Sequence, residues 1–364
     1  MDNIFFILIL ILGLMSSLYR VEHSSRIITP LLFVITISFF IGFRSEFSGV
    51  DTQTYIKIFY QAVESNELVL NYELFFSLII YLSSQFLSVE MYLFFIAFFS
   101  FLGLLIAARM LNLSNATVFI VVFLAFLPGL DLVTNGIRNG LSLTLGLPFF
   151  VYAMIVNKSK RLIPKLINIT PVFFHYSYIP IFFMGFISRK LINYKLSIIL
   201  ILISIVFFTT WIIIPADLIQ GIARPYTSLP DPFGKLARYI ILEKQIMSEG
   251  VKAYFYVVSL LLTLITAIPL LSQPHTAKKD DRYNRLFFIS SLGIMVYSSV
   301  YFMGFSYRFM FLFYPIQILA FTYVWDKYVT NQLTRIIIVA FIILNFLVTY
   351  STSTFTEMDL LFVY

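Results

Sequence analysis

Long apolar runs separated by short polar connections make up most of this chain. An α-helix needs roughly 20 apolar residues to cross the hydrocarbon core of a bilayer, and most of the runs approach this length. They are continuous, whereas the strands of a membrane barrel alternate between polar and apolar positions. The pattern predicts helices at about 3–19, 27–43, 68–87, 91–108, 116–133, 139–156, 165–187, 196–214, 253–272, 286–303, 307–325 and 335–350.

The segment at 165–187 differs from the other runs because prolines interrupt it. Pro164, Pro171 and Pro180 each remove a backbone donor and disturb the preceding turn. Irregular backbone at membrane depth persists mainly where it is buried in protein or lines a cavity. This segment is therefore predicted to be a broken or re-entrant helix.

Composition sets the fold class. Only 12% of the 364 residues are charged, against about 25% in a typical soluble domain, and 60% are hydrophobic. We expect an all-α polytopic membrane protein with about 11–12 transmembrane helices, one segment being broken or re-entrant. Residues 1–364 form a single integral-membrane domain in this prediction, with two longer extracytoplasmic loops at about 44–67 and 215–252.

Basic loops predict the orientation, because cytoplasmic loops of membrane proteins collect lysine and arginine. Two clusters flank 165–187, so this segment should not cross. The turns at 131–138 and 304–308 and the 215–252 loop then fall on the outer face, where we expect the chemistry. The clusters expected inside are Lys158, Lys160, Arg161 and Lys165; Arg189, Lys190 and Lys195; and Lys278, Lys279, Arg282 and Arg285.

Missing residue types exclude several classes of function. The chain has no cysteine, which rules out disulfides, thiolate metal sites and a cysteine nucleophile. His23, His175 and His275 lie far apart and show no metal-ligand spacing, and neither GxxxxGK[ST] nor HExxH occurs. The net charge of +7 indicates orientation in the membrane and not nucleic-acid binding. No metal or cofactor is predicted.

Two arginines at the starts of apolar runs are candidate catalytic groups. Arg138 lies in N-G-I-R-N-G, with Asp131 and Asn135 in the same turn. Arg308 lies in the first turn of an apolar run, where burying its charge would cost about 2.5–3.5 kcal/mol. A guanidinium can bind two phosphate oxygens at once. The alternative is an arginine that snorkels from a helix end to the membrane surface.

Three residues are candidates for acid–base chemistry. Asp51 is the first, and the alternative is a turn aspartate beside Gly49. His175, within the proline-interrupted segment, can act as a base or hydrogen-bond a sugar hydroxyl, and the alternative is a packed core histidine. Glu73, in N-Y-E-L-F-F, is a further carboxylate close to the boundary of an apolar run and a candidate for substrate binding.

Two polar connections supply further candidates for substrate binding. Arg44 and Tyr55 share with Asp51 the island R-S-E-F-S-G-V-D-T-Q-T-Y, and a phenol there can stack on a sugar ring. The 215–252 loop carries cations that can hold a lipid pyrophosphate, and the alternative is a solvated loop attracted to lipid headgroups. These cations are Arg224, Lys235 and Arg238.

Four short motifs, taken in order over roughly residues 30 to 320, resemble the EpsG family. They are R-x4-G-x-D-x3-Y from Arg44 to Tyr55, I-R-N at 137–139, H-Y-S at 175–177 and Y-R at 307–308. The family consists of polytopic bacterial proteins grouped with the Wzy-type polysaccharide polymerases and the GT-C glycosyltransferase clan. The chain departs from the usual motifs at Val50, Asn139 and Tyr178 and keeps the charged positions.

The resemblance implies an enzyme, a polymerase of O-antigen (lipopolysaccharide) or exopolysaccharide synthesis. It would transfer a growing glycan from undecaprenyl pyrophosphate to the non-reducing end of an incoming lipid-linked repeat unit, at the outer face of the cytoplasmic (inner) membrane. Arg138 and Arg308, with Arg44, would stabilise the leaving pyrophosphate. Asp51 first, or His175 second, would act as the base. The transfer is expected to be metal-independent and inverting.

The partners expected from this function are the lipid-linked oligosaccharide, as donor and as acceptor, membrane lipid and a chain-length regulator. Two other functions remain open. A flippase for lipid-linked oligosaccharide would also use cations, although it would be expected to show two comparable halves, which the sequence does not show. An O-antigen ligase would share the fold and the chemistry of histidine and arginine but use a lipid A acceptor.

Overall fold

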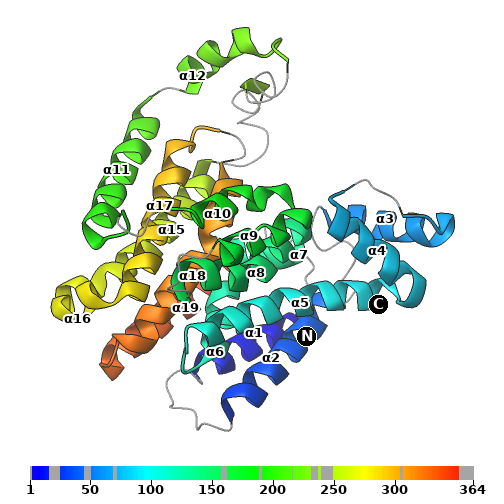
Figure 1. Cartoon of the computed structure of the whole chain (residues 1–364), viewed down its shortest axis with the longest axis horizontal. Helices are drawn as coiled ribbons and strands as arrows, with labels where there is room; N and C mark the ends of the chain where they lie inside the picture. Colours follow the sequence, from blue (N-terminus) through cyan, green and yellow to red (C-terminus); the bar gives the residue numbers. More distant parts are fainter. Residues whose placement is uncertain are drawn as a thin grey trace. The chain divides into compact units, whose positions relative to one another are not determined.

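A computed structural model of the chain describes an all-helical protein (Figure 1). None of the described residues forms a strand. The described residues are 2–15, 25–44, 51–68, 72–156, 162–187, 191–214, 216–230, 237–238, 249–303 and 306–351.

Among these residues, five helices are long and apolar enough to cross a membrane, or six if one bent pair counts as a single span. The all-α polytopic fold class is thereby confirmed, and the total of about 11–12 crossings stays a prediction. The five are Val89–Met110, Ile137–Val156, Tyr194–Ile213, Gly250–Ser272 and Tyr307–Lys327.

The helices fall into two compact units. Unit 1 comprises Met1–Phe186 and Thr322–Tyr364, and unit 2 comprises Ile187–Phe321, so the boundary falls within one helix, α18 (Tyr307–Lys327). Unit 1 also contains α1 (Asp2–Met15), α2 (Ser25–Gly42), α3 (Thr52–Ser65), α4 (Leu74–Phe86), α5 (Val89–Met110), α6 (Ala116–Leu124), α7 (Leu127–Thr134), α8 (Ile137–Val151), the π-helical η2 (Tyr152–Val156) and α19 (Gln332–Ser351).

The central packing of unit 1 brings α5 against α2 and against α8. Glycine permits both close approaches. A Cβ on Gly103 of α5 would lie 2.3 Å from the carbonyl oxygen of Thr144 in α8, and one on Gly42 of α2 would lie 2.3 Å from the Cα of Phe94. Small residues at such crossings let helix backbones come close in a membrane bundle.

The run predicted as one helix at 116–133 is two helices, α6 and α7, bent by 89°. Pro128 lies in the first turn of α7, where its missing backbone N–H interrupts no helical bond. The backbone carbonyl of Ala125 at the bend accepts a 3.2 Å hydrogen bond from Asn345 of α19. A carbonyl group at the bend, which lies outside regular helix, therefore has a polar partner.

The proline-interrupted segment is broken as predicted, into α9 (Ile163–Ile167), the 3-10 turns η3 (Thr170–Phe173) and η4 (Tyr176–Tyr178), and α10 (Ile179–Met184). Tyr178 anchors it to α8, because its buried hydroxyl donates to the carbonyl of Gly146 at 2.8 Å and lies 2.8 Å from Asn168 Oδ1. Gly146 leaves room for the ring, since a Cβ there would lie 2.3 Å from it.

The island predicted as part of a loop at 44–67 contains the helix α3 from Thr52 to Ser65. One face of α3 is buried, with Tyr55, Ile56 and Phe59 packed in a core that includes Phe76 of α4 and Tyr92 of α5. The opposite face is polar and exposed. This amphipathic pattern explains why a polar stretch forms a helix here.

Unit 2 contains α11 (Tyr194–Ile213), α12 (Ala216–Ala223), the 3-10 turn η5 (Arg224–Tyr226), α15 (Glu249–Ser272), α16 (Pro274–Lys279), α17 (Asp281–Ser299) and the first part of α18. α17 packs against α11 and α15. Buried polar side chains join its helices: Thr263 and Ser290 lie 2.9 Å apart, and Gln317 donates to Ser259 at 2.6 Å. Interhelical hydrogen bonds of this kind stabilise membrane bundles.

Candidate active site

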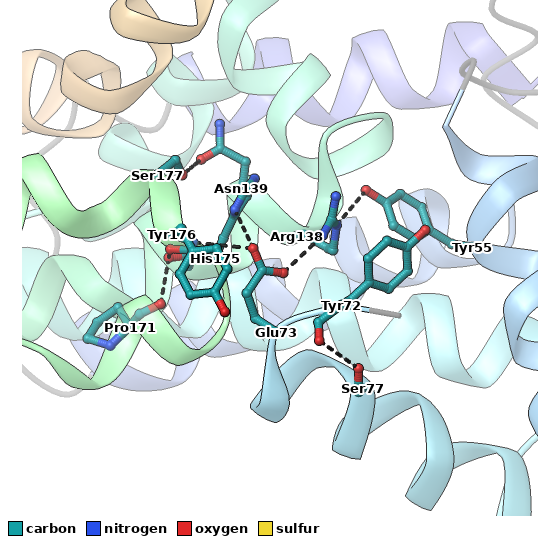
Figure 2. Close-up of polar contacts among 11 residues, drawn as sticks. Tyr55, Tyr72, Glu73, Ser77, Arg138, Asn139, Pro171, His175, Tyr176 and Ser177 are labelled. Atoms are coloured by element: carbon teal, nitrogen blue, oxygen red, sulfur yellow. Dashed lines mark hydrogen bonds and ion pairs between the residues drawn. The ribbon is translucent and has the colours of Figure 1, made fainter. Parts of the chain in front are cut away.

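Glu73, at the start of α4, is the centre of a polar cluster in unit 1 (Figure 2). Its side chain is only 5% exposed. One carboxylate oxygen, Oε2, lies 2.9 Å from Nη1 of Arg138. The other, Oε1, lies 2.9 Å from Nδ1 of His175 and accepts a 3.3 Å hydrogen bond from the backbone N–H of Tyr176. Segments about 65 and 100 residues away in the sequence therefore meet at one carboxylate.

The surroundings keep Glu73 ionised. Burial by itself raises the pKa of this carboxyl. The contact with His175, the residue's own backbone N–H and the charges of His175 and Arg138 outweigh burial and lower the pKa to about 2. Glu73 is consequently an anion at neutral pH and can hold both neighbouring side chains by its charge.

Arg138 lies in the first turn of α8 and is fixed by aromatic groups as well as by Glu73. Its Nε lies 3.4 Å from the hydroxyl of Tyr55, and its Cζ lies 3.9 Å from the centroid of the Tyr72 ring. Its other terminal nitrogen, Nη2, has no partner among the described residues, and 23% of the side chain is exposed. An anion can therefore approach this edge of a guanidinium that is already oriented.

His175 precedes η4 in extended backbone. Its backbone N–H donates to the carbonyl of Pro171 at 3.2 Å, and its own carbonyl accepts from the N–H of Tyr178 at 3.1 Å. The contact of Nδ1 with Glu73 has the distance of a strong ion pair but not the alignment of a good hydrogen bond. A carboxylate beside Nδ1 favours the tautomer with its proton there, which leaves Nε2 as the basic nitrogen.

Asn139 and Ser177 form a second polar pair beside this cluster. The hydroxyl of Ser177 donates to Oδ1 of Asn139, which joins the start of α8 to η4. Both side chains are partly exposed, and Tyr176 between His175 and Ser177 is 65% exposed. The pair is uncharged and flanks the ionic cluster.

Asp51 lies at the N-terminal end of α3 with an exposed side chain. Its backbone N–H donates to Oδ1 of Asn135 at 2.7 Å, and Asn135 donates to Asp131 at 3.1 Å. Burial is the main cause that raises the pKa of Tyr55 and of Tyr72, and the negative charge of Asp51 raises both further. Asp51 is therefore close enough to influence the tyrosines beside Arg138.

Arg44 follows α2, is 5% exposed and binds protein groups. Nη1 donates to the carbonyl of Ile41 at 2.7 Å, while Nη2 donates to the carbonyl of Thr134 at 2.7 Å and to the hydroxyl of Thr52 at 3.3 Å. Burial lowers the pKa of Arg44 to about 10, so it remains a cation at neutral pH. This geometry makes Arg44 a clamp between the ends of α2 and α7 and the start of α3.

The remaining candidates belong to unit 2 or lie outside the described residues. Arg308 is the second residue of α18 in unit 2, and other protein groups leave its side chain exposed. Arg224 and Arg238 are also exposed residues of unit 2, and Arg238 donates to the carbonyl of Thr227 at 3.1 Å. Lys235 lies outside the described residues. The catalytic role of Arg308 and substrate binding by the other three residues stay predictions.

The structure places three further residues at the cluster around Glu73 that were not predicted from the sequence as site residues. Tyr72, Asn139 and Ser177 each lie within two residues of a residue predicted from sequence. Their positions in the motifs N-Y-E, I-R-N and H-Y-S could therefore have identified them as site residues. Among the described residues, no group of three or more histidines and carboxylates is placed to hold a metal ion.

Comparison with known proteins agrees with the motifs. The family model described as "EpsG family" matches residues 27–364, which is nearly the whole chain and includes every residue of the site. No curated protein and no solved structure matches the chain. The family match supports a membrane polymerase of polysaccharide biosynthesis in general terms. The chain belongs to the EpsG family.

Proposed function

We propose that this protein is a polysaccharide polymerase that works on lipid-linked repeat units at the outer face of the cytoplasmic membrane. The donor is a glycan on undecaprenyl pyrophosphate, and the acceptor is the non-reducing end of an incoming lipid-linked unit. The observation that carries the proposal is the triad around Glu73, in which a guanidinium and an imidazole each lie 2.9 Å from one buried carboxylate.

In the proposed reaction, Arg138 and His175 each have one role. A hydroxyl oxygen of the acceptor attacks the anomeric carbon of the donor, and the bond from that carbon to the pyrophosphate oxygen breaks. The leaving lipid pyrophosphate keeps the electron pair, and its charge is stabilised by Arg138. The proton of the hydroxyl passes to Nε2 of His175. Attack from the face opposite to the leaving group inverts the anomeric centre, with no metal in the scheme.

The contact with Glu73 supports His175 over Asp51 as the base. A carboxylate on Nδ1 stabilises the imidazolium that forms during proton transfer. The side chain of Asp51 is exposed and caps no backbone N–H of α3, and its backbone N–H donates to Asn135. Asp51 remains the second candidate, and comparing His175→Ala with Asp51→Asn decides between them.

The test is the pattern of surface polysaccharide on a gel, from the source bacterium with this gene deleted and then complemented. A polymerase predicts that the ladder collapses to a single repeat unit in the deletion strain and returns with the wild-type gene. Arg138→Ala and His175→Ala should fail to restore it although the protein is present in the membrane. Loss of even the single unit would instead favour the flippase or the ligase, and a normal ladder with both variants would refute the assignment of the triad.

A further inference from the structure

We propose that Asn139 and Ser177 form a subsite for the hydroxyl groups of the acceptor sugar. The inference rests on the proposed function and deepens it, because it divides the site into a charged half and a neutral half. The charged half holds Arg138, and the neutral half is the pair formed by Asn139 and Ser177.

The two halves lie on different sides of Glu73. Arg138 contacts Oε2, while His175 and Tyr176 contact Oε1. Figure 2 shows the same order, with Asn139 and Ser177 beyond His175 and Tyr176 on one side of Glu73 and with Arg138 and Tyr55 on the other. An acceptor hydroxyl that reaches His175 therefore brings its own sugar ring close to the pair.

The pair is built to present an amide in a fixed direction. Ser177 donates its hydroxyl to Oδ1 of Asn139, so the amide cannot turn without losing this bond. The amide nitrogen of Asn139 points away from Ser177 (Figure 2) and has no acceptor among the described residues. An amide offers two donors on that nitrogen, and sugar hydroxyls are suitable acceptors.

The chemistry of the neutral half fits a sugar better than a phosphate. Phosphate oxygens are bound most strongly by charged donors, and neither Asn139 nor Ser177 carries a charge. Tyr176, which stands next to Ser177, is 65% exposed and offers an aromatic ring. Aromatic surface combined with a few fixed polar groups is typical of a small-molecule site.

The test measures binding of two probes to the purified full-length protein in detergent micelles by calorimetry. The first probe is inorganic pyrophosphate. The second is the repeat-unit oligosaccharide, released by mild acid from the lipid-linked units of the deletion strain. Asn139→Ala should weaken oligosaccharide binding about tenfold, the effect of losing about one good hydrogen bond, and leave pyrophosphate binding unchanged. Arg138→Gln should do the reverse.

Two further variants keep the outcome decisive. Asn331→Ala removes an exposed amide that caps α19, so both probes should bind as they do to the wild type. Ser177→Ala keeps the amide but frees it to rotate, and we expect a smaller loss, about threefold, for the oligosaccharide alone. Wild-type binding of the oligosaccharide by Asn139→Ala would mean that the pair only joins α8 to η4.

The remaining outcomes separate the subsite from the proposed function. Equal weakening of both probes by Ser177→Ala would overturn the division into halves, even if Asn139→Ala fails to fold. Binding of both probes by the wild type with no effect of Asn139→Ala would remove the subsite and leave the polymerase standing. A wild-type protein that binds neither probe would count against the proposed function, and the subsite would fall with it.

Discussion

Glu73 is a single buried carboxylate that joins three segments of unit 1. It is held as an anion by His175, by Arg138 and by backbone N–H groups. Removing Arg138 or His175 would leave the buried carboxylate of Glu73 with one partner fewer, which is costly. In the proposed function, Glu73, predicted from sequence as a substrate contact, positions Arg138 and His175.

Glu73→Gln is expected to lower polymerase activity about a hundredfold, within the range of general-base contributions. The neutral amide no longer stabilises the imidazolium of His175 and no longer balances Arg138. The measurement is the initial rate of polymer formation from lipid-linked units by the purified variant. Glu64→Gln, on the exposed face of α3, is the matched control and should be fully active. Equal rates for both variants would contradict the role of Glu73.

The depressed pKa of Glu73 also predicts how stability depends on pH. The folded-state pKa is about 2, below the ordinary value of 4.5, so the unfolded chain binds a proton first as the pH falls. The stability that Glu73 contributes is therefore full above about pH 4.5 and is lost as the pH falls from there towards 2. The difference in Tm between the wild type and Glu73→Gln should shrink over this range. A difference that stays constant from pH 6 to pH 3 would refute the assignment.

At the scale of helices, the site depends on the short turn between α7 and α8 and on its contacts with α3. Arg44 and Asp51 connect the start of α3 to the end of α7, through Thr134 and Asn135. Gly140 lets α8 pass against α7, since a Cβ there would lie 1.8 Å from the carbonyl oxygen of Leu132. The position of Arg138 is thus set by backbone packing as much as by its own contacts.

Gly140→Ala is expected to destabilise the protein by about 1–3 kcal/mol, the usual effect of overpacking, and to reduce activity by moving Arg138. Gly136→Ala is the matched control, because a Cβ at Gly136 would have its nearest neighbour at 3.8 Å. Thermal unfolding in detergent and the rate of polymer formation are the two measurements. Similar Tm values for the two variants would show that α7 and α8 can separate without cost.

The positions of the helices could be predicted from the sequence better than the contacts between them. Apolar runs gave most of the long helices, and prolines gave the break at 165–187, because both signals are local. The bend between α6 and α7 was missed because it lies within one apolar run, and α3 was missed because its polar face resembles a loop. The contact of Glu73 with Arg138 and His175 joins distant segments, which no local pattern reports.

At the scale of the whole molecule, the two units each have their own polar interior. Unit 1 holds the cluster around Glu73, and unit 2 holds the buried bonds of Gln317, Ser259, Thr263 and Ser290. A pyrophosphate carries more negative charge than one arginine can balance. Pyrophosphate binding by the exposed cations of unit 2, Arg224, Arg238 and Arg308, stays a prediction.

The orientation of the chain in the membrane can be tested by labelling single cysteines. Because the protein has no cysteine, single cysteines can be introduced without first removing any. Lys57→Cys is on the exposed face of α3. It should react with a membrane-impermeant maleimide in intact cells in which the reagent reaches the outer face of the cytoplasmic membrane. Lys195→Cys and Lys279→Cys should react only after the membrane is opened, because basic clusters are retained inside.

The same experiment tests the segment that carries His175. Lys165 and Lys195 flank it, and a segment that does not cross must leave both on the same side. We expect Lys165→Cys and Lys195→Cys to be protected together in intact cells and labelled together after permeabilisation. Labelling of only one of them in intact cells would mean that the broken segment crosses the membrane. His175 would then lie on a segment that crosses the membrane. The elements on one side of this segment in the chain would then face the membrane side opposite to the one predicted.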